Sequence, residues 1–221
     1  RITATEFDAT RGRAWQGWEA ILPYIPDTAS LSVLDVGCGN GRFAIFLDEN
    51  ISTPISYHGV DNSAKLLTFA KKSLFPLDLQ SLTLTEQDII TQPPDTGQYN
   101  LVGLFGVMHH IPGAEHRLSM MKTLAERVLP GGLLIFAAWR FYEYERFSRR
   151  FVDAPADLPL EKGDFLLDWR RGERALRYCH YVDDAEHDAL VAATGFTELK
   201  RYRADGSDNR MNCYSILQNP S

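Results

Sequence analysis

The chain has 221 residues, of which 44% are hydrophobic, and a formal net charge of −6 at pH 7. This length fits one large domain or two small ones, and the composition predicts an ordinary globular core. The negative charge excludes a protein dominated by non-specific nucleic-acid binding, although it leaves room for a local basic face. The longest apolar runs are far shorter than the roughly 18 residues that indicate a membrane span, so no membrane contact is expected.

The three cysteines predict free thiols. Cys38, Cys179 and Cys213 are odd in number and show no CxxC spacing, which argues against a disulfide framework or a zinc site. Reduced thiols are typical of the cytoplasm, and no signal peptide is visible after Arg1. We therefore expect a cytoplasmic protein, and whether residues precede Arg1 is left open.

Helices and strands are predicted to alternate over the first two thirds of the chain. Residues 14–24 carry apolar side chains at helical spacing, and Pro23 and Pro26 end this helix. Strands are expected over 31–36, 57–61, 82–85, 99–107 and 133–139, and further helices over 42–49, 63–72 and 114–129, the last ended by Pro130-Gly131-Gly132. This alternation predicts an α/β fold with a doubly wound, mostly parallel sheet.

After Trp139 the alternation stops. Residues 140–182 are rich in aromatic residues and hold eight arginines among the chain's 23 basic residues. An insertion of this size after the fifth strand is where a substrate lid would lie. A helix over 183–194 and an antiparallel hairpin of strands 196–203 and 212–217 follow. We expect one domain over residues 1–221, with an N-terminal segment and helix in residues 1–30.

The stretch that organises the chain is VLDVGCGNGRF, residues 33–43, where a strand passes through a glycine-rich turn into a helix. The turn alternates glycine with small or polar residues: Gly37, Cys38, Gly39, Asn40 and Gly41. Absent side chains let the backbone approach a ligand closely, and a helix N-terminus offers free N–H groups. The pattern DxGxGxG, with Asp35 before the turn, differs from the GxGxxG of dinucleotide sites. A carboxylate directed into the turn favours a ligand with a positive end, such as the sulfonium and α-ammonium of S-adenosylmethionine.

Two more acidic residues follow strands along the same carboxyl edge, where ligands of open α/β sheets bind. Asp61 lies 20 residues past the last glycine of the turn, which is the position of a ribose-binding carboxylate, and Asn62 follows it. Asp88 follows the next strand, where an acid can accept a hydrogen bond from an adenine amino group. The alternatives are a helix-capping acid at position 61 and a solvated loop acid at position 88.

The order of these strands, helices and motifs resembles that of the S-adenosylmethionine-dependent methyltransferases of Rossmann-like fold (class I). The resemblance covers nearly the whole chain, from the DxGxGxG turn through the two later acids to Pro130-Gly131-Gly132 and the terminal hairpin. It implies a seven-stranded sheet with an antiparallel last strand and a glycine turn beneath the methionine part of the cofactor. It also implies Asp61 at the ribose, Asp88 with Ile89 at the adenine, and Phe105 among the cofactor-binding residues.

A narrower resemblance is to the wobble-uridine tRNA methyltransferases that esterify a 5-carboxymethyl group, and to their bacterial relatives. It rests on GCGNGR, on the pair His109-His110, on Thr10-Arg11 followed by Trp15, and on Arg177-Tyr178-Cys179-His180. In that branch the last motif usually reads Arg-Tyr-Tyr-His, so Cys179 departs from it. Residues 208–212 match the branch's Asn-Trp element only loosely.

Methyl transfer requires alignment of nucleophile, methyl group and sulfur, and exclusion of water. A carboxylate acceptor is already ionised at pH 7 and needs no base, and arginine binds carboxylates bidentately. We therefore predict His109, His110, Arg177 and His180 as the catalytic residues. The alternative for each is that it packs or holds the insertion in place. No metal site is expected, because adjacent histidines point apart and no third ligand is apparent.

The sequence thus predicts a methyltransferase that uses S-adenosylmethionine, forms S-adenosylhomocysteine and acts on an acidic acceptor. The acceptor is a carboxylate on a modified tRNA uridine or, alternatively, a small molecule methylated on oxygen or nitrogen. With a net charge of −6 the chain would need an activating, basic protein partner to hold tRNA. A non-catalytic S-adenosylmethionine-binding module is the alternative of another class, and the glycine spacing disfavours an NAD enzyme. The oligomeric state is left open.

Overall fold

The computed structural model describes residues 14–169 and 175–220, so Thr10 and Arg11 of the motif comparison lie outside it. Its centre is a seven-stranded sheet in the order β3-β2-β1-β4-β5-β10-β9. The strands are β1 (Leu31–Val36), β2 (Ile55–Asp61), β3 (Ser81–Glu86), β4 (Tyr99–Phe105), β5 (Val128–Trp139), β9 (Thr197–Ala204) and β10 (Asn212–Gln218). The first five pair in parallel, and β10 runs antiparallel to both β5 and β9. The predicted α/β sheet with an antiparallel last strand is confirmed.

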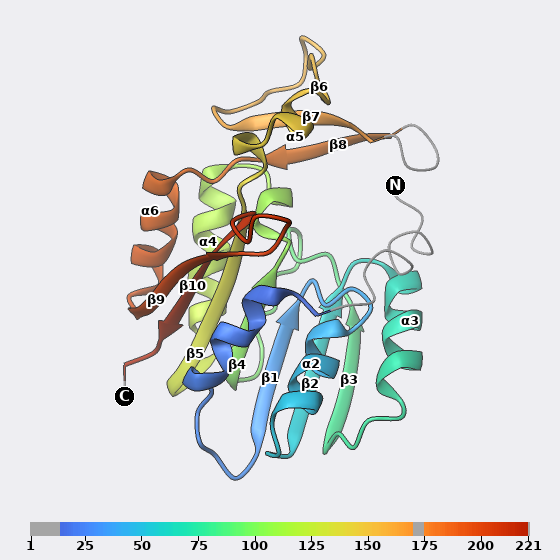
Figure 1. Ribbon diagram of the computed structural model, residues 1–221, viewed down its shortest axis with the longest axis vertical. Coiled ribbons are helices and arrows are strands. Elements are labelled where there is room, and N and C mark those ends of the chain that lie inside the picture. The colour runs from blue at the N-terminus through green and yellow to red at the C-terminus, as the bar shows by residue number, and fades with distance from the viewer. Residues whose placement is uncertain (1–13, 170–174, 221) are drawn as a thin grey trace.

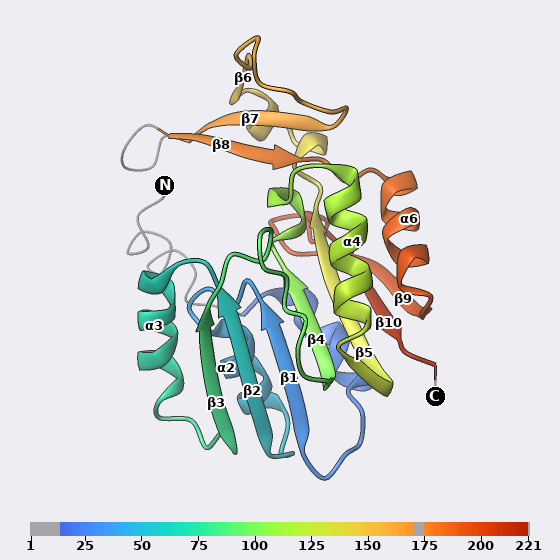
Figure 2. The same cartoon turned by 180° about the vertical axis from the view of Figure 1, so that it is seen from behind.

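Helices cover both faces of this sheet (Figures 1 and 2). One face carries η1 (Gln16–Tyr24), α2 (Arg42–Asn50) and α3 (Ala64–Leu74); the other carries α4 (Ala114–Ala125) and α6 (Asp184–Thr194). Successive side chains of a strand point to opposite faces, so Val33 belongs to the first core and Leu34 to the second. None of the described helices is long and apolar enough to cross a membrane.

Local signals set several of the boundaries. The predicted strand 31–36 is β1 without change. Helix α3 begins after Ser63, whose hydroxyl accepts a hydrogen bond from the Leu66 amide at 3.4 Å. Helix α6 is capped by the carboxylate of Asp183 and ends at Gly195, which adopts the left-handed conformation. These are the residue types that favour helix starts and ends.

Other boundaries differ from the prediction. The first helix is a 3₁₀ helix that begins at Gln16 and contains Pro23, so that proline does not end it. Helix α4 ends at Ala125 instead of Leu129, and residues 130–132 lie inside β5 instead of between the two elements. The reason is pairing with the end of the chain: the Gly131 amide donates to the Asn219 carbonyl at 3.0 Å, and the Asn219 amide donates to Gly132 at 3.0 Å.

The insertion forms a second, antiparallel sheet in the order β6-β7-β8, which the sequence did not predict. Its elements are η3 (Phe141–Glu143), α5 (Glu145–Ser148), β6 (Phe151–Val152), β7 (Asp164–Trp169) and β8 (Ala175–His180). Phe141, Leu167 and Cys179 form a small core of its own. In both views this sheet lies beyond the carboxyl ends of the parallel strands (Figures 1 and 2). Strand β8 contacts η2 (Met108–His110), the short helix that follows β4.

Candidate active site

The glycine turn is held to the neighbouring strand β2. The amide of Gly37 donates to the Val60 carbonyl at 2.7 Å, and the amide of Gly39 donates to the Asp61 carboxylate at 2.9 Å. Gly37 has a φ of +76°, and a Cβ atom there would lie 2.2 Å from a methyl carbon of Val107. Only glycine fits this position, both for its backbone conformation and for its space.

Asp61 joins the turn to helix α3. One of its carboxylate oxygens accepts from the Gly39 amide, and the other accepts from the Ser63 amide at 2.9 Å. Burial raises the pKa of this carboxyl, and the backbone hydrogen bonds oppose part of that rise. Each oxygen keeps a lone pair for a further donor, so the group can still accept hydrogen bonds from a ligand.

A cavity of about 310 Å³, here called the turn cavity, lies beside the turn. Nine of the eleven predicted cofactor residues line it: Gly37, Cys38, Gly39, Asn40, Asp61, Asn62, Asp88, Ile89 and Phe105. Asp88 is exposed and accepts from the Ile90 amide at 3.0 Å. Arg42 and Gln87 also line the cavity and were not predicted, although each lies within one residue of a predicted one.

The other two predicted residues lie away from this wall. Gly41, with a φ of +82°, starts helix α2 and packs against Leu74. Asp35 is buried, and its carboxylate accepts from the Tyr57 hydroxyl at 2.6 Å. Burial raises the pKa of Asp35 to about 7. The structure corrects the expectation that this carboxylate is directed into the turn. The side chain is buried instead, and the Tyr57 hydroxyl holds it by a hydrogen bond.

A second cavity of about 490 Å³ adjoins the first and is here called the aromatic cavity. Its walls come from η1, α2, η2, β5, the insertion and the hairpin loop: Ala14, Trp15, Gln16, Arg42, Gly106, His109, Trp139, Phe147, Arg177, Asp205, Gly206, Met211 and Asn212. Four of these residues, Trp15, Arg42, Gly106 and Arg177, line both cavities. A ligand in one cavity would therefore meet a ligand in the other at this boundary.

The buried carboxylate of Asp205 ties two walls of the aromatic cavity together. It accepts from the Gly17 amide of η1 at 3.0 Å, from the Tyr214 hydroxyl at 2.5 Å and from the Asn212 side chain at 2.7 Å. In the sequence, Asp205 lies between the two predicted strands of the terminal hairpin. Its contacts join residues as many as 188 positions apart, so no local pattern could have revealed them.

Arg177 of β8 lies at the boundary of the two cavities. Its Nη2 atom is 2.6 Å from Nε2 of His110 and 3.4 Å from Nε2 of His109, and its guanidinium lies over the Trp139 ring at 5.5 Å. A guanidinium only donates, so the histidine nitrogens accept. His110 then carries its proton on Nδ1, which donates to the Tyr178 carbonyl at 3.1 Å. Burial lowers the pKa of Arg177, and the group still stays charged at neutral pH.

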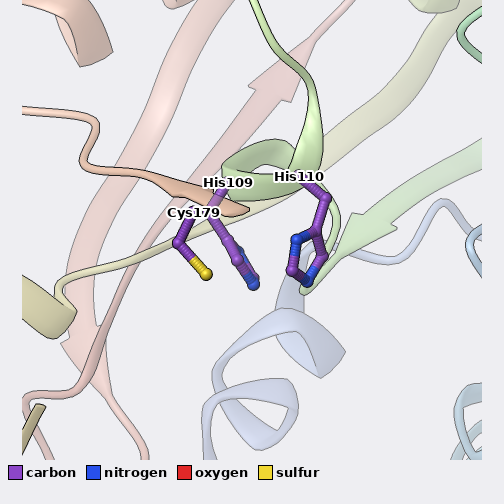
Figure 3. Close-up of side chains that lie close together, drawn as sticks. All are labelled: His109, His110 and Cys179. Atoms are coloured by element: carbon purple, nitrogen blue, oxygen red, sulfur yellow. The ribbon is translucent and has the colours of Figure 1, made fainter. Parts of the chain in front are cut away.

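His109 and His110 do not point apart, which corrects the reason given against a metal site. Both lie in the tight turn of η2, and their ring centroids are 4.1 Å apart. Cys179 of β8 lies beside them, and the three side chains point to the same side (Figure 3). One ligand atom from each lies within 4.8 Å of the others. All three cysteines are free thiols, as predicted.

His180 lies outside both cavities, so the geometry does not support the predicted catalytic role. One of its ring nitrogens is 2.6 Å from the Asp164 carboxylate, and the other is 2.6 Å from the Glu186 carboxylate. Burial lowers the pKa of His180, but these two acids outweigh burial and raise it. Buried Arg117 bonds to Glu186 and Glu161 in the same cluster. His180 therefore fastens the insertion to helices α4 and α6.

Comparison with known proteins adds to this geometry. Residues 34–134 match the family model of a methyltransferase domain. The chain is 25% identical over 170 residues to the "Probable tRNA methyltransferase 9B" of Mus musculus. That match covers 76% of this chain but only 32% of the mouse protein, so the chain spans about a third of its length.

Solved structures share the fold. An S-adenosylmethionine-dependent methyltransferase of Methanosarcina mazei superposes with a TM-score of 0.69 at 17% identity, over 91% of this chain and 97% of that one. The N-methyltransferase NodS of Bradyrhizobium japonicum, in complex with S-adenosyl-L-homocysteine, gives 0.64 at 14% identity, over 93% and 87%. Residues 34–134 therefore match a methyltransferase domain, and the sheet order and these structures show that the chain has the fold of class I S-adenosylmethionine-dependent methyltransferases.

Proposed function

We propose that the turn cavity holds S-adenosylmethionine, which supplies an electrophilic methyl group on a sulfonium. The chemistry of the wall fits this molecule: backbone amides and Asp61 can hold its polar groups, and Ile89 and Phe105 offer apolar surface to a base. Asp61 would accept from the ribose hydroxyls, and Asp88, with Ile89, would lie at the adenine. Burial raises the pKa of Asp35 to about 7 in the cofactor-free protein, and a cofactor cation near this carboxyl would favour its ionised form.

Replacing Asp61 by alanine should weaken binding of S-adenosylhomocysteine by about 1–3 kcal/mol, since hydrogen bonds to a charged group are lost. The variant also frees the amides of Gly39 and Ser63, so unfolding by denaturant must be measured beside calorimetric affinity. Asparagine is a poor substitute here, because its NH₂ group would face one of these two donors. Unchanged affinity in a folded Asp61→Ala protein would contradict the placement of the ribose.

The aromatic cavity is proposed to bind the methyl acceptor, and the acceptor to be an anion, most simply a carboxylate that becomes a methyl ester. The observation that carries this proposal is the partly buried guanidinium of Arg177 at the boundary of the two cavities. A guanidinium binds a carboxylate through a planar fork and can aim one of its oxygens toward the methyl group. The carboxylate oxygen forms the new bond to carbon, and the sulfur keeps the electron pair of the bond that breaks.

Two candidates remain for the methyl acceptor. The similarity to tRNA methyltransferases supports a carboxymethyl group on a tRNA uridine, whose flat base would pack against the aromatic wall that Trp139 and Phe147 form together. A cavity of about 490 Å³ also suits a small metabolite, methylated on oxygen or nitrogen. For tRNA, the net charge of −6 leads us to propose a basic protein partner. Free thiols favour a cytoplasmic setting.

Tritium transfer from labelled S-adenosylmethionine tests these candidates directly. The protein is incubated with total tRNA or with a small-metabolite extract, at low and moderate salt, and the product is then treated with base. Label in tRNA that base releases as methanol would support an ester on the nucleoside. Label that base releases as methanol only in the metabolite fraction would support a carboxylate acceptor and exclude tRNA as its source. Label that resists base in both fractions would contradict the carboxylate acceptor.

Replacing His109 by alanine should lower turnover about 10- to 100-fold, because the histidine lines the aromatic cavity and contacts Arg177. Affinity for S-adenosylhomocysteine should stay nearly constant, since His109 is not part of the wall of the turn cavity. Exposed His116 provides the control variant His116→Ala, with both values expected at wild-type level. Equal losses of turnover and of cofactor affinity would show instead that His109 supports the fold of η2.

A further inference from the structure

We propose that His109, His110 and Cys179 form a binding site for a divalent cation of borderline softness, with Zn²⁺ as the natural example. The set consists of two imidazoles and one thiol, with one ligand atom of each within 4.8 Å of the others (Figure 3). Zn²⁺ prefers nitrogen and sulfur ligands, and three protein ligands with an open fourth position are typical of its non-structural sites.

Two of the three ligand atoms already face a cation. Nε2 of His110 and Nε2 of His109 both face the Arg177 guanidinium, at 2.6 and 3.4 Å. Their lone pairs are therefore directed at one positively charged position, which a metal ion can take over if the guanidinium leaves. Arg177 borders both cavities, so open space is available to receive it.

Cys179 gives the two histidines a third ligand. The thiol is buried in the small core of the insertion, which holds it in place beside the histidines. Burial raises its pKa to about 11, so it carries a proton in the metal-free protein. Metal binding must therefore release that proton to solvent as the sulfur–metal bond forms, and the apparent affinity should rise about tenfold per pH unit near neutrality.

A metal ion at this site would displace the Arg177 guanidinium from the position in which it is proposed to bind the acceptor anion. The bound ion would therefore inhibit methyl transfer, a consequence that rests on the proposed function. The binding test itself does not rest on it, because it uses no substrate and no cofactor.

Co²⁺ alone, added to the reduced protein, tests the site by absorption spectroscopy. We expect one equivalent to bind with a thiolate-to-cobalt charge-transfer band, with visible bands of a four-coordinate ion, and with displacement by Zn²⁺. The Cys179→Ser variant should lose the charge-transfer band, and Cys213→Ser, which removes a buried free thiol elsewhere, should keep it. Circular dichroism confirms that both variants fold.

Persistence of the thiolate band in Cys179→Ser would overturn the proposal, and so would its absence in the wild-type protein. Co²⁺ bound without that band would indicate oxygen and nitrogen ligands, as in the neighbouring group of Glu161, Asp164 and His180. His110→Ala should weaken Co²⁺ binding at least tenfold, and wild-type affinity in that variant would equally contradict the assignment.

Discussion

Arg177→Gln should lower kcat/KM for the methyl acceptor about 10²- to 10³-fold, the size of effect seen when one preorganised charge-binding donor is removed from an active site. The reason is the position of the guanidinium: it is held by His110 and by the face of Trp139 where the two cavities meet. Glutamine keeps part of the length and polarity of arginine but neither its charge nor its fork. The measurement is steady-state transfer of labelled methyl groups to whichever acceptor fraction takes up label.

The same variant should bind S-adenosylhomocysteine within about threefold of the wild-type affinity, a change of less than 1 kcal/mol. Arg177→Lys should recover only part of the activity, since an ammonium binds a carboxylate as a point charge. Arg149, exposed and paired with Glu145 in the same insertion, gives the control variant Arg149→Gln with full activity expected. An Arg177→Gln enzyme with unchanged kcat/KM would mean that the acceptor needs no cation there.

The parts of this site that follow from local sequence were predictable. The turn of residues 37–41, Asp61 and Asp88 lie at the ends of neighbouring parallel strands, and strand order places those ends together. Hydrophobic runs and helix caps also located β1 and α6 closely. In each case the structure is decided by residues a few positions apart, where periodicity and capping act.

The aromatic cavity was not predictable in the same way. Its wall combines η1, the insertion and the hairpin loop, and the contact between Arg177 and His110 joins residues 67 positions apart. Strand β7, DFLLDW, mixes charged and apolar residues without strict alternation, which hid the second sheet. The tight turn of η2 brings adjacent histidines side by side, against the expectation for neighbouring residues in an extended chain.

Asp35 should make the cofactor-free protein less stable as the pH rises from about 4 to about 7. Its carboxyl is buried, and burial raises its pKa from 3.8 to about 7. Between these two values the folded state holds a proton that the unfolded state has lost, so the free energy of unfolding falls with increasing pH. Below about pH 4 both states are protonated, and above the folded pKa the full loss has occurred. A shift of this size corresponds to roughly 4 kcal/mol for complete ionisation.

Asp35→Asn isolates this effect, because its amide oxygen can still accept from the Tyr57 hydroxyl while no ionisation takes place. Urea unfolding is measured at pH 5 and pH 8 for both proteins, and the change between the two pH values is compared, so that any constant cost of the amide cancels. The wild type should lose about 2–3 kcal/mol more than the variant over this interval. Exposed Asp95 gives the control Asp95→Asn, which should behave as wild type.

A wild-type protein that gains stability relative to Asp35→Asn on going to pH 8 would show instead that Asp35 is ionised in the folded state. The Tyr57 hydroxyl and the amides of the turn would then outweigh its burial.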